Sequence, residues 1–310
     1  MAISAQMVKE LREMTGAGML DSKKALEATN GDMEQAVEFL RKKGLAGAEK
    51  KAGRITAEGV VMTEISDDKK TAVVVEVNSE TDFVSKNEKF RDYVSNVTKQ
   101  ALVSDSKDME SFLSEKWSLD NTKTVKEELS SQISIIGENL TIRRKEKINI
   151  TNGFIESYIH DKGRIGVLVA VESNVVNDEL IKMAHNVAMQ VASMRPKFLD
   201  DSEISDEFKN KEKEIVLEEA KNQNPDKPEN IIKGMVEGRF NKHLKEICLM
   251  NQVFIMAEDG KQLVWQYVKN VADKNNANVK IVKYLRFETG EGIEKKQEDF
   301  AAEVAKQMGN

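Results

Sequence analysis

The chain has 310 residues, of which 40% are hydrophobic and 32% are charged. This length favours two or more domains, and the longest apolar run, 165–171, is far too short to span a membrane. The formal net charge of −6 arises from the acidic segment 200–230, so no concentrated basic face is available for nucleic-acid phosphates.

The N-terminal part of the chain predicts a compact bundle of three short helices. Ser4 is a suitable N-cap for a first helix whose apolar residues recur every three or four positions. Asp21 and Asp32 are the expected N-caps of the second and third helices, and Gly44 is the expected C-terminal stop. The small and charged residues of 46–53 then predict a linker.

Two β-rich segments repeat one pattern along the chain. Each contains a predicted hairpin, an amphipathic helix and a late strand. The hairpins cover 59–78 and 153–172, and the late strands cover 140–144 and 279–285. We therefore predict an α+β fold whose core is two antiparallel three-stranded sheets with helices against them.

The segment after Pro196 predicts an inserted helical hairpin, or coiled-coil arm. Apolar residues, including Ile215, recur at helical spacing on both sides of a turn that contains Pro225 and Pro228. Because helices with so thin an apolar seam are marginal alone, we expect the arm to pack on a second copy or on a partner. Cys248, the single cysteine, lies in an apolar helical stretch and is expected to be an inert buried thiol.

These elements divide the chain into five parts. The predicted parts are an N-terminal bundle with its linker at 1–54, a first core subdomain at 55–148, a second at 149–196 and 248–290, the arm at 197–247, and a C-terminal helical module at 291–310.

Motifs for catalysis, cofactors and metals are absent from the sequence. The glycines of 15–21 and 290–295 do not form a dinucleotide-binding fingerprint, and there is no Gly-Lys-Ser/Thr phosphate loop. The three histidines are scattered with no neighbouring cysteine. We expect no enzymatic activity, no cofactor and no metal. The absence of a secretion signal and the single cysteine further predict a cytoplasmic location.

The segment Asn78-Ser79-Glu80-Thr81-Asp82-Phe83-Val84-Ser85 places an aromatic residue in a predicted turn. Its own residues favour a Phe83 that plugs the bottom of its sheet. However, Thr-Asp-Phe-Val after a Glu-Val-Asn strand resembles the elongation factor Ts family. The resemblance extends in order to 11–26, 50–53, 136–139, 163–168 and 287–295, whereas the turn at 158–163 and the arm depart from the family pattern.

The resemblance implies a guanine-nucleotide exchange factor for the GTPase elongation factor Tu in translation elongation. In this family the N-terminal bundle resembles a ubiquitin-associated domain and docks on the GTPase, the arm mediates dimerisation, and the C-terminal helix reaches back to the partner. Thr81, Asp82, Phe83 and Val84 would displace Mg²⁺ from the GTPase, so that GDP leaves and GTP replaces it. The other residues implied to contact the partner are Leu11, Met19, Leu20, Lys23, Lys51, Ile136, Gly137, His160, Ile255 and Met256.

Two other functions and one mechanistic choice remain open. The chain could be a ribosome- or nascent-peptide-binding adaptor that uses residues 1–45, or a scaffold assembled through the arm. Asp82 could act on the partner's Mg²⁺ through its charge or could cap the following turn. We expect a mixed role, in which the cap positions Phe83 and the charge adds a smaller effect.

Overall fold

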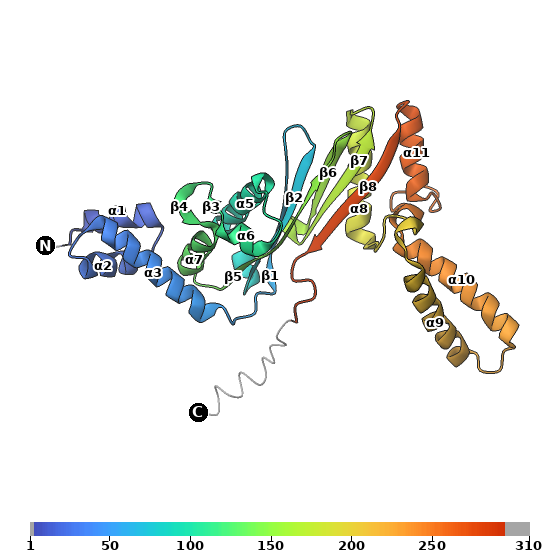
Figure 1. Ribbon diagram of the computed structural model, residues 1–310, viewed down its shortest axis with the longest axis horizontal. Coiled ribbons are helices and arrows are strands. Elements are labelled where there is room, and N and C mark those ends of the chain that lie inside the picture. Colours follow the sequence, from blue (N-terminus) through green and yellow to red (C-terminus); the bar gives the residue numbers. More distant parts are fainter. Residues whose placement is uncertain (1–2, 295–310) are drawn as a thin grey trace.

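The computed structural model describes residues 3–294 and shows an elongated molecule (Figure 1). A helical bundle lies at the N-terminal side, two packed sheets lie in the middle, and a helical hairpin projects at the opposite side. Both of these sheets are antiparallel and three-stranded, which confirms the predicted α+β fold. Among the described residues, no helix combines the length and the apolar character that a membrane span requires.

The bundle consists of α1 (Ala5–Thr15), α2 (Met19–Ala28) and α3 (Met33–Lys51). The hydroxyl of Ser4 accepts a hydrogen bond from the backbone N–H of Met7 at 3.2 Å, and the carboxylate of Asp32 accepts one from that of Gln35 at 3.0 Å. Both predicted N-caps are therefore confirmed. The buried side chains that hold the three helices together are Val8, Leu11, Ala25, Leu26 and Ala36.

Two details of the predicted bundle are wrong. α2 begins at Met19, so Asp21 lies inside its first turn, where a negative charge suits the helix dipole, and does not cap it. α3 continues past Gly44 to Lys51, through most of the predicted linker. A Cβ at Gly44 would lie 3.7 Å from the carbonyl oxygen of Ser130 in α7. The glycine thus allows two helices to approach closely instead of ending one of them.

The first sheet has the strand order β1-β2-β5, and α5 follows β2 and covers its outer face. These elements are β1 (Glu58–Ile65), β2 (Thr71–Ser79), α5 (Glu88–Val103) and β5 (Leu140–Asn149). Smaller elements complete this subdomain: α4 (Asp82–Ser85), α6 (Met109–Ser114), β3 (Lys116–Trp117), β4 (Asp120–Thr124) and α7 (Val125–Ile136). An ion pair between Arg41 and Glu127 joins α3 to α7 and thereby the bundle to the core.

The second sheet repeats this plan with the order β6-β7-β8, and α8 follows β7 as α5 follows β2. Its elements are β6 (Phe154–His160), the 3-10 turn η1 (Asp161–Gly163), β7 (Ile165–Ser173), α8 (Asp178–Met194), α11 (Val264–Lys274) and β8 (Val279–Glu288). The repeat extends to a register shift in the middle strand, which falls between Glu76 and Val77 in β2 and between Ala170 and Val171 in β7.

The two sheets pack face to face and bury an apolar layer between them (Figure 1). Side chains of this layer include Val61, Ala72, Val74, Ile148, Ile155, Leu168, Leu285 and Phe287. The outer faces are covered by α5 and α8, so the middle strand of each sheet is buried on both sides. This explains why β2 and β7 are almost entirely buried and why their sequences are so rich in valine.

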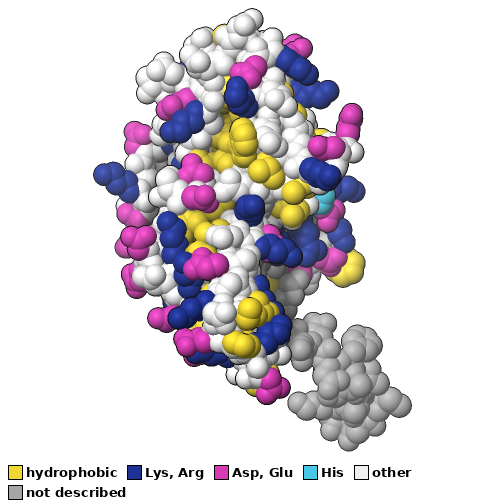
Figure 2. Space-filling view, turned by 90° about the vertical axis from the view of Figure 1, so that its right-hand side faces the viewer, with side chains coloured by type: hydrophobic (Ala, Val, Ile, Leu, Met, Phe, Trp, Pro, Cys, Tyr) yellow, Lys and Arg dark blue, Asp and Glu magenta, His cyan; other side chains and the backbone are white. Residues whose placement is uncertain are grey.

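The arm consists of α9 (Asp206–Gln223) and α10 (Glu229–Ile247), preceded by the 3-10 turn η2 (Asp201–Glu203) and followed by η3 (Leu249–Asn251). Its thin seam is confirmed and contains Val216, Ala220, Ile232 and Val236. Ile215, which the sequence placed at this seam, is exposed, and its neighbour Val216 is buried instead. Figure 2 views the molecule from the side of the arm, where hydrophobic side chains lie among acidic and basic ones.

Two further predictions concern the segments after the arm. Cys248 is buried, as predicted, but follows the last residue of α10 rather than lying in a helix. Burial, together with a hydrogen bond to Asp201, raises the pKa of its thiol to about 12. Of the predicted C-terminal helical module, 291–294 are described and are not helical, and 295–310 lie outside the described residues.

Candidate partner-binding surface

Phe83 lies on α4, a single helical turn directly after β2. The hydroxyl of Thr81 is the N-cap of this turn and accepts a hydrogen bond from the backbone N–H of Val84 at 3.5 Å. Phe83 is 82% exposed, the highest value among the large hydrophobic residues of the described chain. The expectation that Phe83 plugs its own sheet is therefore wrong, because the capped turn directs the ring to solvent.

Three partly buried hydrogen bonds hold the residues at the start of α4 against the segment that follows α7. The carboxylate of Glu138 accepts hydrogen bonds from the backbone N–H and the hydroxyl of Thr81, at 3.0 and 2.6 Å. The carboxylate of Glu80 accepts one from the backbone N–H of Asn139 at 2.5 Å. These contacts bring Ile136 and Gly137 beside the turn that carries Phe83. The sequence does not predict the supporting role of Glu80 and Glu138, although both lie within the motifs at 78–85 and 136–139.

The internal repeat shows that the sheet itself does not require α4. In the first subdomain, Asn87, the N-cap of α5, lies eight positions after Ser79, the last residue of β2. In the second, Asn177, the N-cap of α8, lies only four positions after Ser173, the last residue of β7. Four residues therefore suffice for this connection, and the additional residues of the first subdomain present Phe83.

Asp82 is the first residue of α4 and makes an ion pair with Lys86 at 2.6 Å. The hydrogen bond from Lys86 lowers the pKa of this carboxyl group, and an aspartate is ionised at neutral pH even at its ordinary pKa. Because Thr81 supplies the N-cap, the predicted capping role of Asp82 is wrong. Its charge lies on the surface next to the exposed ring of Phe83.

His160 lies at the end of β6, immediately before η1, and is exposed. Its Nδ1 is 2.8 Å from the hydroxyl oxygen of Tyr158. The guanidinium of Arg91 donates hydrogen bonds to the carbonyl oxygens of Ser85 in α4, at 3.4 Å, and of Lys162 in η1, at 2.9 Å. Arg91 therefore connects the element that carries Phe83 to the turn that follows His160.

The residues predicted on the bundle behave differently from one another. Met19 is 63% exposed and Leu20 is 73% exposed, and Lys23, in an exposed ion pair with Glu27, lies on the same helix. Leu11, in contrast, is fully buried in the bundle core, so its predicted role as a contact residue is wrong. Its apolar spacing in α1 is that of a core residue, which supports the surface without forming it.

Lys51 is half-buried at the end of α3, where the bundle meets the core. Ile255 and Met256 lie at the opposite side of the molecule and are both exposed. The fully buried Gln190 of α8 fixes their loop, because its Oε1 accepts a hydrogen bond from the backbone N–H of Ile255 at 2.8 Å. Its Nε2 donates to the carbonyl oxygen of Val253 at 3.1 Å. Sequence analysis did not find Gln190, which looks like an ordinary residue of an amphipathic helix.

The predicted contact residues thus lie on three parts of the molecule rather than around one pocket. The structure brings together the turn at 81–84, the end of α7 and the η1 turn, whereas the bundle and the loop at 255–256 offer separate exposed apolar side chains. Such a distributed, partly apolar surface is suited to a large protein partner. Among the described residues, no group of three or more His, Cys, Asp or Glu side chains is arranged to hold a metal ion.

Comparison with known proteins identifies the family. A family model described as Elongation factor TS matches residues 80–291, which include α4, α7, the η1 turn, the loop at 255–256 and the arm. The chain is 51% identical over 308 residues to elongation factor Ts of Clostridium novyi (strain NT), with 99% of each chain covered. It is 50% identical over 306 residues to that of Clostridium tetani (strain Massachusetts / E88), and 47% identical over 308 residues to that of Halothermothrix orenii (strain H 168 / OCM 544 / DSM 9562), again with 99% of each chain covered. The chain therefore belongs to the elongation factor Ts family of translation elongation factors.

Proposed function

We propose that the protein is a guanine-nucleotide exchange factor for the GTPase elongation factor Tu and has no enzymatic activity of its own. The observation that carries this proposal is the exposed ring of Phe83 on α4, an inserted turn that the fold does not need. Single exposed apolar side chains are common on protein surfaces, but Phe83 is presented by a capped turn that the second subdomain lacks. Burial of this ring by a partner would contribute to binding.

In the proposed mechanism, the turn at 81–84 enters the nucleotide-binding domain of the GTPase beside its Mg²⁺ ion. Phe83 occupies space next to the ion, and the ionised Asp82 brings a negative charge close to its ligands. Mg²⁺ neutralises the phosphates of the bound GDP, so its displacement weakens GDP binding. GDP then leaves, and GTP replaces it.

Magnitudes show that Phe83 cannot act alone. Accelerating nucleotide release by ~10⁴-fold requires about 5.5 kcal/mol, whereas burying one phenylalanine contributes about 1.5–3 kcal/mol. The remainder must come from surfaces that bind the nucleotide-free GTPase more tightly than the nucleotide-bound form. Met19 and Leu20 on the bundle and Met256 on the second subdomain are suitable exposed side chains. By linkage, bound nucleotide weakens the binding of the factor to the GTPase by the same coupling energy.

The arm is proposed to mediate self-association. The small apolar core between α9 and α10 contains Val216, Ala220, Ile232 and Val236, whereas Ile231 on α10 is exposed. An exposed apolar side chain on a helical hairpin of so little internal core favours packing against a second copy.

The test is the release of fluorescent GDP from purified elongation factor Tu, with and without this protein. We expect catalytic amounts of the protein to accelerate release by several orders of magnitude. The acceleration should be largest at millimolar Mg²⁺, where the ion must be displaced, and small after chelation of Mg²⁺. If release is unchanged while the protein binds ribosomes or nascent peptides through its bundle, the adaptor function replaces the exchange function.

A further inference from the structure

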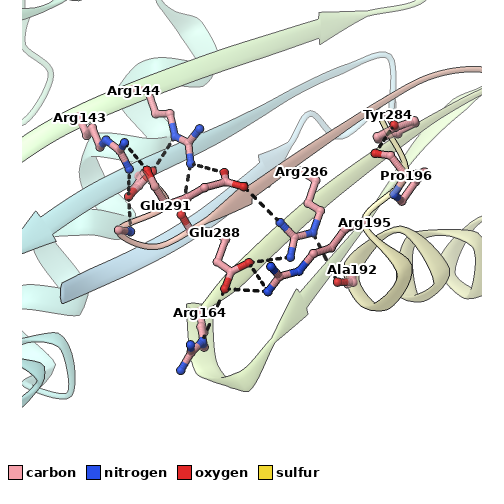
Figure 3. A network of polar contacts seen from close by, with 12 residues as sticks. Arg143, Arg144, Arg164, Ala192, Arg195, Pro196, Tyr284, Arg286, Glu288 and Glu291 are labelled. Carbon is pink, nitrogen blue, oxygen red and sulfur yellow. Dashed lines mark hydrogen bonds and ion pairs between the residues drawn. The ribbon is translucent and has the colours of Figure 1, made fainter. Parts of the chain in front are cut away.

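The two core sheets are joined at both ends of the sandwich. At one end, β5 runs into β6 through only four residues, and the backbone N–H of Ile155 donates a hydrogen bond to the carbonyl oxygen of Lys69 at 2.9 Å. At the other end, the turn at 288–291 after β8 lies against the first subdomain (Figure 3). The turn at 81–84 follows the same end of β2 and begins five positions beyond Glu76.

Glu76 holds this second end together. Its carboxylate is fully buried and accepts hydrogen bonds from Arg143 at 3.0 Å and from Arg144 at 2.6 Å. It also accepts one from the backbone N–H of Gly290 at 2.8 Å. A buried carboxylate is costly unless it is paired and hydrogen-bonded, as it is here. At the equivalent position before the register shift, the second sheet has Ala170, so the fold of such a sheet does not itself require an acid.

The turn at 288–291 is held from several sides. The guanidinium of Arg144 lies over the ring of Phe287 at 4.1 Å and donates a hydrogen bond to the carbonyl oxygen of Glu288 at 3.2 Å. Gly290 has φ 72°, and a Cβ at this position would lie 2.2 Å from the carbonyl oxygen of Ala57. The turn therefore fits against the first subdomain only with a glycine at 290.

A second acid connects the same turn to the rest of the second subdomain. Glu288 accepts hydrogen bonds from Arg286 at 2.8 Å and from Arg195, the C-cap of α8, at 3.1 Å. Figure 3 shows Arg195 and Arg164 converging on this carboxylate. The backbone N–H of Thr289 also donates to the carbonyl oxygen of Arg164 at 2.9 Å, next to η1. One turn thus contacts β2, β5, the residue after η1 and the C-terminal end of α8.

We infer that the turn at 288–291 is a latch that fixes the relative orientation of the two core subdomains, and that Glu76, Arg144 and Gly290 are positioning residues for nucleotide exchange. This inference rests on the proposed function. The proposed contact residues lie on both subdomains, and a fixed separation lets one partner engage them together without the cost of ordering the two subdomains. A rigid connection raises the effective concentration of the second contact once the first has formed.

Gly290→Ala tests the latch, because it forces the turn away from Ala57 without removing any charged side chain of the network. Gly292→Ala is the matched control: it has a similar φ of 75°, but its Cβ would meet nothing within 4 Å. Spin labels at Lys107→Cys and Lys261→Cys, both exposed and on different subdomains, report the distance between the subdomains. The buried Cys248 stays unlabelled.

We expect Gly290→Ala to broaden the distribution of distances between the two spin labels. In GDP release, the concentration of this protein that gives half the maximal rate should rise by roughly 10-fold, and the maximal rate should stay within about 2-fold of wild type. Gly292→Ala should leave both unchanged. Arg144→Gln changes a half-buried side chain and should shift the label distances and the half-saturating concentration in the same direction as Gly290→Ala. This second variant tests the latch if the Gly290→Ala protein does not fold.

Unchanged distances in Gly290→Ala and Arg144→Gln would overturn the latch. A maximal rate that falls in proportion to the fraction of folded protein would also overturn the latch, since Gly290 would then affect stability only. If the wild-type protein does not accelerate GDP release, the exchange function fails. The distance measurement still tests the latch in that case.

Discussion

Replacing Phe83 with alanine removes the most exposed large hydrophobic side chain of the described chain. Full burial of a phenylalanine contributes about 1.5–3 kcal/mol, and 82% of Phe83 is available for burial by a partner. The substitution should therefore raise the barrier to exchange by about 1.2–2.5 kcal/mol, which corresponds to a rate reduced by about 8- to 70-fold. Because the ring makes little contact with its own fold, the free energy of unfolding should change by less than about 0.5 kcal/mol.

The assay is the release of fluorescent GDP from elongation factor Tu over a series of factor concentrations, combined with thermal unfolding of each variant. Leu119→Ala is the matched control, because Leu119 is also strongly exposed, at 68%, but lies outside the proposed contact residues. This control should exchange nucleotide at the wild-type rate. A Phe83→Ala protein that unfolds at a much lower temperature, yet retains normal exchange per folded molecule, would show that the ring supports its own sheet.

Three further outcomes are expected. Asp82→Asn should slow GDP release by about 2- to 5-fold at millimolar Mg²⁺ and have little effect after chelation, because solvent screens an exposed charge. Wild-type behaviour at every Mg²⁺ concentration would exclude a role for the charge. Since Lys86 lowers the pKa of Asp82, the carboxylate is ionised above its ordinary pKa and loses its charge only below it, so this difference should persist from pH 8 to about pH 5. Excision of the arm between Leu199 and Lys245 with a short Gly/Ser bridge should abolish self-association and retain much of the exchange activity, and an unchanged mass in sedimentation would refute the dimer proposal. The thiol of Cys248, with a pKa raised to about 12, should react with iodoacetamide at pH 8 far more slowly than in the urea-unfolded chain, and equal rates would contradict its burial.

Local sequence signals were reliable where the structure depends on local chemistry. The N-caps Ser4 and Asp32 satisfy the first backbone N–H groups of their own helices, and this requires no tertiary information. The valine-rich strands were recognisable because both faces of each sheet are covered. The internal repeat followed from the recurrence of hairpin, helix and late strand, and the order of strands in both sheets confirmed it.

Local signals failed where a distant part of the chain decides the outcome. Gly44 has the usual signature of a helix end, but α3 continues through it, and the glycine allows α7 to approach closely. Leu11 belongs to a family motif, yet its burial assigns it to the core. α7 itself was not predicted, although the capping box of Thr124 and Glu127 marks its first turn.

The residues of the candidate site could be named from the sequence because the Thr81-Asp82-Phe83-Val84 motif is contiguous. Their arrangement depends on packing: Phe83 points outward, Thr81 rather than Asp82 caps the turn, and Glu138 holds it. The partners of Glu76 likewise depend on packing, because its hydrogen-bond donors come from β5 and from a turn more than 200 positions later. Hydrogen bonds between residues so far apart leave no periodic pattern in the sequence, since their geometry is set by the packing of the two sheets.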